Sequence, residues 1–391
     1  MVRLILSRGV AVTAAGFALI AVTYGLIRFS YGQFMPIIRQ ELNLTEGMAG
    51  VISCALFVGN CTALLFAALA TERYGARLVA SAAGVIATVG LTGMAVSSSQ
   101  LAFAAWLMLA GSSAGLSMPP LVLAIVQTVR EERQAIATTI VNAGTGVGIM
   151  ISGPIAIYFT GLWRMSFAGF AVLSLATTIA IVLILPKNKK SMKGAAKAKG
   201  RVWKNSAAYP LLGSAFLFGA VCASFWTFGG EILSTFGGWS NSDISWFWIL
   251  IGIAGLAGAP AGACVRHFGV RGIHMFSFLI LASAIILMGL AREHVAFAAI
   301  SGAMFGVVYM LQTGLYLVWG MDEFPDRPAA IVAAAFFMLP LGQVVGSVFM
   351  GFGIEFLGTQ ETLFCFVLLC LLGALYLPPR KSNNQSPVFA T

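Results

Sequence analysis

The sequence predicts an all-α membrane protein with twelve transmembrane helices. Of its 391 residues, 59% are hydrophobic and only 9% are charged, and the mean hydropathy is +0.92. A soluble domain is about 45–50% apolar and about 25% charged, so this composition excludes a soluble enzyme. The few charges cluster between long apolar stretches, and roughly 20 apolar residues suffice for one membrane span. A multi-pass membrane protein follows.

Twelve apolar runs carry this prediction. Each is about twenty residues or longer and apolar all round, without the ten-residue alternation of membrane barrel strands. The runs cover residues 10–36, 47–70, 78–97, 101–127, 134–158, 165–185, 207–235, 243–264, 272–291, 295–320, 329–355 and 362–378. They divide the chain into a six-helix bundle (1–186), a basic linker (187–206), a second six-helix bundle (207–379) and a tail (380–391).

The distribution of basic residues predicts the orientation. Of the 23 Lys and Arg residues, 19 lie in one set of alternate connections and only Arg39, Arg164 and Arg292 lie in the other. Cytoplasmic loops are enriched in Lys and Arg, so both termini and the linker are predicted to be cytoplasmic. The net charge of +10 is therefore explained by topology, and we expect no nucleic-acid partner. Arg28 is the one basic residue inside a span.

The two bundles show an internal repeat, which is common in transporters. A shift of 194 residues places residues 74–77, Tyr-Gly-Ala-Arg, on residues 268–271, Phe-Gly-Val-Arg. Both segments follow the second span of their bundle. The same shift aligns Gly148 with Gly342, and it superposes the fourth to sixth spans on the tenth to twelfth without a gap. We interpret this as a duplication of one six-helix unit.

The connection between the second and third spans carries a family motif. The pattern is Gly, three residues, Asp, Arg, any residue, Gly and two basic residues, and residues 68–77 retain Arg73, Gly75 and Arg77. Glu72 replaces the Asp, and alanines replace the first Gly and one basic residue. With its two six-helix halves and basic linker, the whole chain resembles the major facilitator superfamily of secondary transporters. The resemblance implies that this loop locks the halves together in the outward-facing state; the alternative is an ordinary basic hairpin.

Other family patterns match less well. The fourth span lacks the buried arginine of many proton-coupled members, and the Gly-Pro at residues 153–154 does not have antiporter spacing. The first span, with Tyr24-Gly25-Leu26-Ile27-Arg28-Phe29-Ser30-Tyr31-Gly32 and a helix-ending Pro36, is similar to the bacterial YbfB/YjiJ-type branch. This resemblance implies a bacterial inner-membrane protein.

Arg28 is the principal candidate for binding substrate. A permanently charged guanidinium within a span is costly unless it faces protein or a water-filled cavity, and its fork of donors suits carboxylate or phosphate. The alternatives are snorkelling to the headgroups or a structural pairing with Glu231. Tyr24 and Tyr31 lie near the same helix face.

The second half contributes further candidates for the cavity wall. In the first span of this half the candidate is aromatic. In the fourth span the candidates lie along one helical stripe of polar and aromatic residues. The predicted substrate-binding residues of this half are Trp226, Tyr309, Gln312, Thr313 and Tyr316. Asn60, Asn142 and Gln343 are expected either to line the cavity or to form hydrogen bonds between helices.

The sequence assigns the coupling ion less clearly. Glu231 and Glu355 are the only acids near or within spans, and both lie close to predicted periplasmic ends. Glu231 is the proton-coupling candidate, whereas His274 is interpreted as an ordinary histidine at a span boundary. The six cysteines lie in apolar runs without metal-ligand spacing, so we expect no metal and no cofactor.

These features favour secondary transport of a small organic anion by alternating access, coupled to H⁺. The alternative is a proton-driven antiporter that exports amphipathic compounds. An enzyme is disfavoured because there is no cluster of nucleophile, base or metal ligands, and a sensor because no soluble domain is present. We expect a monomer in the lipid bilayer.

Overall fold

The structure, a computed structural model, describes residues 2–159, 161–187, 206–258, 261–292, 294–324 and 328–376. Within these ranges the regular elements are all helical, which confirms the predicted all-α class. The predicted tail and nearly all of the predicted linker lie outside the described residues.

The first half consists of six long apolar segments, the first of which is interrupted. Its elements are α1 (Val2–Ile20), the π-helix η1 (Ala21–Phe29), α2 (Tyr31–Glu41), α3 (Glu46–Tyr74), α4 (Ala76–Val96), α5 (Gln100–Thr128), α6 (Glu131–Tyr158) and α7 (Trp163–Ile184). The second half follows a short 3₁₀ turn, η4 (Ser206–Ala208). Its elements are α8 (Tyr209–Trp226), α9 (Gly229–Glu231), the π-helix η5 (Ile232–Phe236), α10 (Asn241–Ala257), α11 (Ala261–Gly289), α12 (Val295–Glu323), α13 (Pro328–Leu357) and α14 (Thr359–Leu375).

Ten helical segments of the described chain are long and apolar enough to cross a membrane. Two further apolar helices, α10 and α14, have 17 residues each and correspond to the eighth and twelfth apolar runs. At 1.5 Å per residue such a helix spans about 25 Å, slightly less than the roughly 30 Å of a bilayer core.

Pro36 does not end a helix, contrary to the sequence prediction; it lies inside α2. A proline removes the hydrogen bond to the carbonyl four residues earlier, here that of Gly32. This carbonyl packs against Gly230 of the second half, where a Cβ would lie 2.3 Å from the oxygen. The residue whose carbonyl loses this hydrogen bond therefore lies in the contact between the halves.

The same helix pairing occurs in both halves. In the first half α3 packs on α5, α4 on α7, and α6 on α1 and η1; in the second half α10 packs on α12, α11 on α14, and α13 on α8. Gly75 and Gly269, which the 194-residue shift aligns, both have positive φ values, 86° and 72°. L-residues rarely adopt this conformation, so glycine is required at both.

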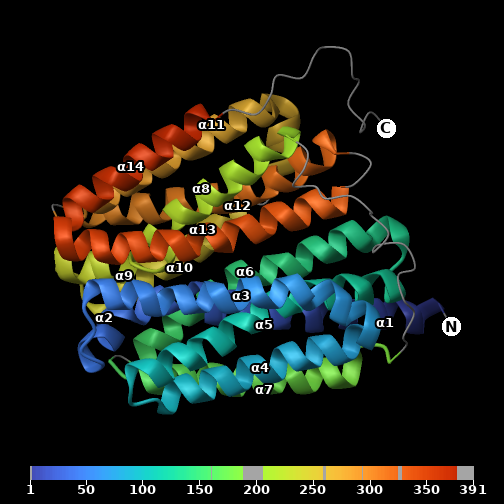
Figure 1. The fold of residues 1–391 in the computed structure, drawn as a ribbon. Coiled ribbons are helices and arrows are strands. Elements are labelled where there is room, and N and C mark those ends of the chain that lie inside the picture. Colours follow the sequence, from blue (N-terminus) through green and yellow to red (C-terminus); the bar gives the residue numbers. More distant parts are fainter. Residues whose placement is uncertain are drawn as a thin grey trace.

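The halves meet chiefly where α3 packs on α13, α6 on α10 and α2 on α9, and α2 also contacts α8 and α10. Figure 1 shows the first half in blue to green and the second in yellow to red, with α4 and α7 on one outer side and α11 and α14 on the other. We call the end that carries α2 and α9 the gate end. The opposite end, where α1 begins and α14 ends, is the terminal end.

Candidate functional site

The segment that carries Arg28 is not an ordinary α-helix. Residues Ala21–Phe29 form a π-helix, a wide turn that is frequently found at functional sites. It packs closely on α6, where a Cβ on Gly25 would lie 2.4 Å from the Cα of Gly148. The sequence analysis did not predict the π-helix, and the close Gly25–Gly148 contact was visible only as separate glycines.

Arg28 is buried between the two halves. Only 6% of the residue is exposed, and its Nη2 donates a 2.7 Å hydrogen bond to Oε1 of Gln343 on α13. Its guanidinium carbon lies 5.4 Å from the ring centre of Tyr24, 5.0 Å from that of Phe29 and 5.9 Å from that of Phe57. Its Nε has no hydrogen-bond partner. The guanidinium is thus held by a neutral amide and aromatic faces.

Both alternative roles proposed for Arg28 from the sequence are wrong. A snorkelling arginine would extend to the headgroups, but Arg28 is buried and its hydrogen bond crosses to the other half. Glu231 is not its partner, because that carboxylate pairs with Arg39. Of the two roles foreseen for Gln343, the structure shows a hydrogen bond between helices, and its partner is the buried arginine.

Aromatic side chains of the second half cover the same region. The ring of Trp226 lies 4.3 Å from that of Phe29, and the ring of Tyr309 lies 5.4 Å from it. The Trp226 indole Nε1 is buried without a hydrogen-bond partner. The structure therefore brings together Arg28, Tyr24, Trp226 and Tyr309 from the predicted set.

The other predicted substrate-binding residues lie elsewhere. Tyr31 accepts a 3.3 Å hydrogen bond from Ser53 and packs on Phe103 inside the first half. Thr313 donates to the carbonyl of Tyr309 in its own helix. Gln312 and Tyr316 belong to a separate buried network within the second half, described below.

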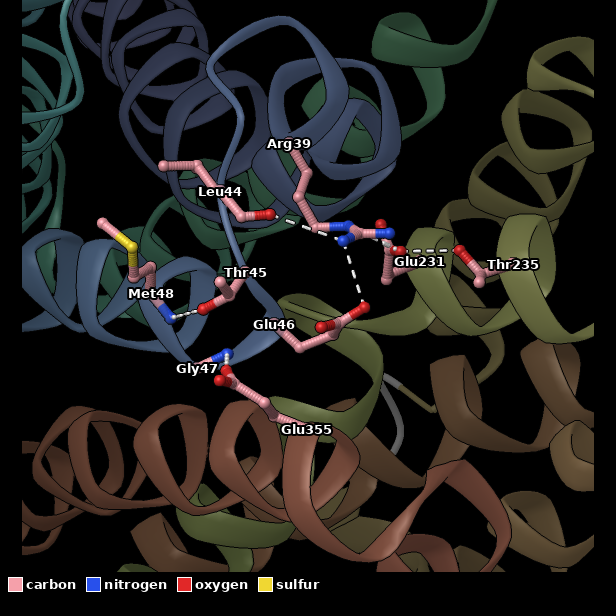
Figure 2. A network of polar contacts seen from close by, with 9 residues as sticks. All are labelled: Arg39, Leu44, Thr45, Glu46, Gly47, Met48, Glu231, Thr235 and Glu355. Atoms are coloured by element: carbon pink, nitrogen blue, oxygen red, sulfur yellow. Dashed lines mark hydrogen bonds and ion pairs between the residues drawn. The ribbon is translucent and has the colours of Figure 1, made fainter.

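At the gate end an ion-pair network joins the halves (Figure 2). Arg39, in the last turn of α2, contacts Glu46 of its own half at 3.0 Å and Glu231 of the other half at 2.9 Å. Thr235 donates a 2.6 Å hydrogen bond to Glu231, which is only 3% exposed. The sequence analysis placed Arg39 among the outer-loop charges and did not predict this pairing.

A second acidic contact lies beside it. Oε2 of Glu355, near the end of α13, accepts a 2.7 Å hydrogen bond from the backbone N–H of Gly47 in the first turn of α3 (Figure 2). The N-terminus of a helix carries unpaired N–H groups and a partial positive charge, which favours a carboxylate there. The second half therefore caps a helix of the first.

The predicted gate loop lies at the opposite, terminal end. Arg77 donates to the Leu183 carbonyl at 3.1 Å, and Arg73 lies over the ring of Tyr74 at 5.4 Å. Glu72 is partly buried in the last turn of α3, beside Gly75, whose positive φ turns the chain into α4. Among the contacts recorded for the described residues, none of these side chains reaches the second half.

A cavity of about 490 Å³ opens at the terminal end of the first half. Its wall is mostly apolar and comes from α1, the connection between α5 and α6, and α6, with two arginines at the rim. The lining residues are Gly9, Val10, Thr13, Ala14, Phe17, Thr128, Val129, Arg130, Arg133, Ile136, Ala137 and Ile140. Val10, Ala14 and Phe17 lie on one face of α1, and η1, which carries Tyr24 and Arg28, continues this helix.

Comparisons with known proteins agree with this architecture. A family model of the Major Facilitator Superfamily matches residues 17–340, and the chain belongs to this superfamily. Its members are membrane transporters, not enzymes. No match is found among curated protein sequences.

Solved structures share the fold at low sequence identity. A mutant of the nucleoside transporter NupG aligns with a TM-score of 0.77 and 13% identity over 93% of this chain and 98% of its own. A D-xylose-proton symporter aligns with a TM-score of 0.76 and 14% identity, over 95% of this chain and 97% of its own. The inward-open xylose transporter XylE from E. coli aligns with a TM-score of 0.77 and 14% identity, over 97% of this chain and 98% of its own.

Proposed function

We propose that this transporter carries a small organic anion with one charged group and an apolar body, by alternating access around Arg28. The observation that carries the proposal is the burial of Arg28 against a neutral amide. None of the ion pairs recorded for the described residues includes Arg28.

The electrostatics of this site favour an anionic ligand. Removing an ion from water costs several kcal/mol of free energy even after the protein relaxes. A cation–π contact offsets only about 0.5–2 kcal/mol of this cost. The amide of Gln343 satisfies one of the five guanidinium N–H groups. A carboxylate or similar anion at the fork would supply the missing charge and acceptors.

Other unpaired donors support the same class of ligand. The indole Nε1 of Trp226 and the amide Nδ2 of Asn60 are buried without hydrogen-bond partners, as is Nε of Arg28. All three atoms donate and none accepts. Asn60 lies one turn after Phe57, whose ring contacts Arg28. A ligand with acceptor oxygens would satisfy donors from both halves.

The shape of the surroundings indicates an apolar body. Tyr24, Phe29 and Phe57 surround the guanidinium, and Trp226 and Tyr309 cover Phe29 from the second half. The cavity at the terminal end is also mostly apolar. One buried cation among aromatic rings fits a monoanion, such as an aromatic carboxylate, better than a dianion, whose second charge would be unpaired.

The contacts between the halves support an inward-facing state. With both termini in the cytoplasm, the gate end is periplasmic, and Arg39, Glu231 and Glu355 form the external gate. The cavity at the terminal end then opens to the cytoplasm, with Arg130 and Arg133 attracting anions. Glu72, Arg73, Gly75 and Arg77 form the internal gate, which locks the halves only when the cytoplasmic side closes.

Binding to the purified protein tests the substrate class. We expect benzoate to raise the unfolding temperature in a saturable way, succinate to do so less, and tetraphenylphosphonium not at all. Arg28→Ala should abolish the benzoate effect, and Arg28→Lys should weaken it because lysine lacks the fork. Arg292→Ala, an exposed arginine, is the control. Benzoate stabilisation that persists in Arg28→Ala would overturn the proposal.

The apolar cavity also supports a second function, proton-driven export of amphipathic compounds from the bacterial inner membrane. In that case tetraphenylphosphonium should stabilise the protein irrespective of residue 28. We propose H⁺ as the coupling ion and a monomeric transporter in both cases; a D-xylose-proton symporter shares the fold.

A further inference from the structure

A buried histidine in the second half lies at the centre of a hydrogen-bonded network. His274 on α11 is 0% exposed, and its neighbours Ser214, Gln312 and Tyr316 are also fully buried. Its Nε2 lies 3.0 Å from the carbonyl of Gly373 on α14. Its Nδ1 lies 3.3 Å from Ser214 Oγ on α8 and 3.3 Å from Gln312 Nε2 on α12. One side chain thus links four helices.

The network assigns the proton positions. A carbonyl only accepts, so Nε2 of His274 carries a hydrogen and donates to Gly373. With the Gln312 amide nitrogen facing it, Nδ1 is an unprotonated acceptor, because an amide nitrogen only donates. The ring is therefore neutral in this state. The hydroxyl of Ser214 lies 2.8 Å from that of Tyr316 and can donate or accept.

Two features prepare the network for a second proton. Oε1 of Gln312 is buried without a partner, so rotating the amide by half a turn would present this acceptor to a protonated Nδ1. Ser214 can also turn its hydroxyl from Nδ1 to Tyr316. In addition, Gly373 lies in the last turn of α14, where the helix dipole favours a positive charge.

None of the ion pairs recorded for the described residues includes His274. The helices packed against it carry three acids at their ends, Asp322 and Glu323 in the last turn of α12 and Glu361 in the first turn of α14. Their other titratable side chains are phenols and thiols, which remain neutral below about pH 8: Tyr209 and Cys222 on α8, Tyr309 and Tyr316 on α12, Cys365 and Cys370 on α14 and, just after it, Tyr376. The cation Arg271 lies one turn earlier on α11. Among these side-chain types, only histidine has an unperturbed pKa between pH 5 and 8.

We propose that His274 is the proton-binding residue of this transporter and that its protonation shifts the equilibrium between the gate-closed and gate-open states. The inference rests on the proposed ion-coupled transport. Aromatic contacts connect the two sites: Tyr316 lies 6.1 Å from Phe218, Phe218 lies 6.0 Å from Tyr309, and Tyr309 lies 5.4 Å from Phe29, beside Arg28. Protonation rearranges the Tyr316 end of this series.

Glu231, the proton-coupling candidate of the sequence analysis, is better suited to gating. It already has a charged partner, and Arg39 and Glu46 around it have side chains that are 20% and 26% exposed at the gate end. The close contact of Gly32 with Trp226 and Gly230 separates this end from Arg28.

The chain has three histidines, so nitrogen NMR of the ¹⁵N-histidine-labelled full-length protein resolves the question directly. His274→Gln identifies the His274 signal, and His294→Asn, at an exposed helix cap, is the control. We expect the His274 nitrogens to show uptake of a proton by Nδ1 as the pH is lowered from neutral. We also expect the midpoint to move in Glu355→Gln, because proton binding and gate opening are reciprocally linked. A His274 signal that stays neutral over the whole pH range would overturn the proposal, as would the same midpoint in the wild type and in Glu355→Gln.

Transport provides a second test. The substrate for this test is benzenesulfonate, which stays ionised and so does not cross the bilayer as a neutral acid. In proteoliposomes, His274→Gln should lose uphill accumulation driven by a pH gradient at least about tenfold and retain downhill exchange, whereas His294→Asn should retain both. Accumulation at the wild-type level in His274→Gln would overturn the proposal. If the wild type transports no benzenesulfonate while His274 still titrates with a gate-dependent midpoint, the anion substrate is wrong and the proton site stands.

Discussion

Glu355 caps a helix of the opposite half: its carboxylate accepts a 2.7 Å hydrogen bond from Gly47 in the first turn of α3. The contact joins residues 308 positions apart in the chain. Because α3 and α13 belong to different halves, we expect this contact to break when the gate end opens in the proposed transport cycle. It therefore stabilises one transport state relative to the other.

Glu355→Gln should open the gate end. Loss of the charge at a helix N-terminus costs about 1 kcal/mol, which is about a fivefold shift in the equilibrium. The readout is alkylation of Ser245→Cys, a buried α10 position near Gln33, by a membrane-impermeant maleimide added outside. Glu361→Gln is the control, because Glu361 lies in the first turn of α14 in its own half. Equal alkylation in both variants would contradict the role assigned to Glu355.

The Arg39–Glu231 pair should show strong energetic coupling. A double-mutant cycle with Arg39→Gln and Glu231→Gln is expected to give a coupling free energy of about 2 kcal/mol, since close, desolvated charge pairs couple strongly. The control is the 2.8 Å pair Arg164–Glu41, whose side chains are 32% and 45% exposed. Exposed pairs contribute at most about 1 kcal/mol. The two coupling free energies follow from the free energies of unfolding of all variants, measured in mixed detergent. Equal coupling free energies for the two pairs would argue against a buried gate pair.

Much of the architecture could be predicted because the membrane imposes it locally. Apolar runs identified the helices, and the aligned glycines at 75 and 269 revealed the repeat, since both adopt positive φ. Pro36 was misread because its effect depends on a partner: the Gly32 carbonyl, which receives no hydrogen bond from Pro36, packs on Gly230, which is distant in sequence.

The site was only partly predictable for the same reason. Arg28 was identifiable as a lone charge within a span, but its partner Gln343 lies 315 residues away. The helical stripe that grouped Tyr309 with Tyr316 identified the correct face of α12. The two tyrosines nevertheless lie at different sites, since Tyr309 contacts Phe29 and Tyr316 belongs to the network around His274. Periodicity specifies a face of a helix, not which neighbour packs on each turn.

Gln343→Glu should eliminate anion binding by pairing with Arg28. A carboxylate at the position of the amide oxygen, 2.7 Å from Nη2, would neutralise the guanidinium. We expect benzoate affinity to fall by at least about tenfold, or roughly 1.4 kcal/mol, without loss of thermal stability. Gln343→Met, which removes the hydrogen bond but adds no charge, should bind better than Gln343→Glu. The opposite order, measured by isothermal titration calorimetry, would show that charge at Arg28 does not select the substrate.

Stability at low pH should depend on Glu41, which lies outside the apolar spans. Burial tends to raise the pKa of its carboxyl, but hydrogen bonds from Trp163 and Arg164 and the charge of Arg164 outweigh burial and lower it. Because the folded pKa lies below the unfolded value, the stabilisation is present above about pH 4.5 and disappears as the pH falls through the folded pKa. Wild type should therefore melt above Glu41→Gln at pH 7, and the difference should vanish in acid. A constant difference in unfolding temperature would rule out this ionisation.

Gly32→Ala should prevent closure of the gate end. A Cβ on Gly32 would lie 2.3 Å from the Trp226 carbonyl oxygen, a backbone atom that cannot move without displacing α8. Gly169→Ala is a suitable control, because a Cβ there meets nothing within 4 Å and alanine favours a helix by up to about 1 kcal/mol. The Gly32 variant should therefore react faster at Ser245→Cys and transport more slowly, while the Gly169 variant keeps both rates. The clash exists only when the gate is closed, so unchanged alkylation in Gly32→Ala would mean that the halves do not separate at this contact during transport.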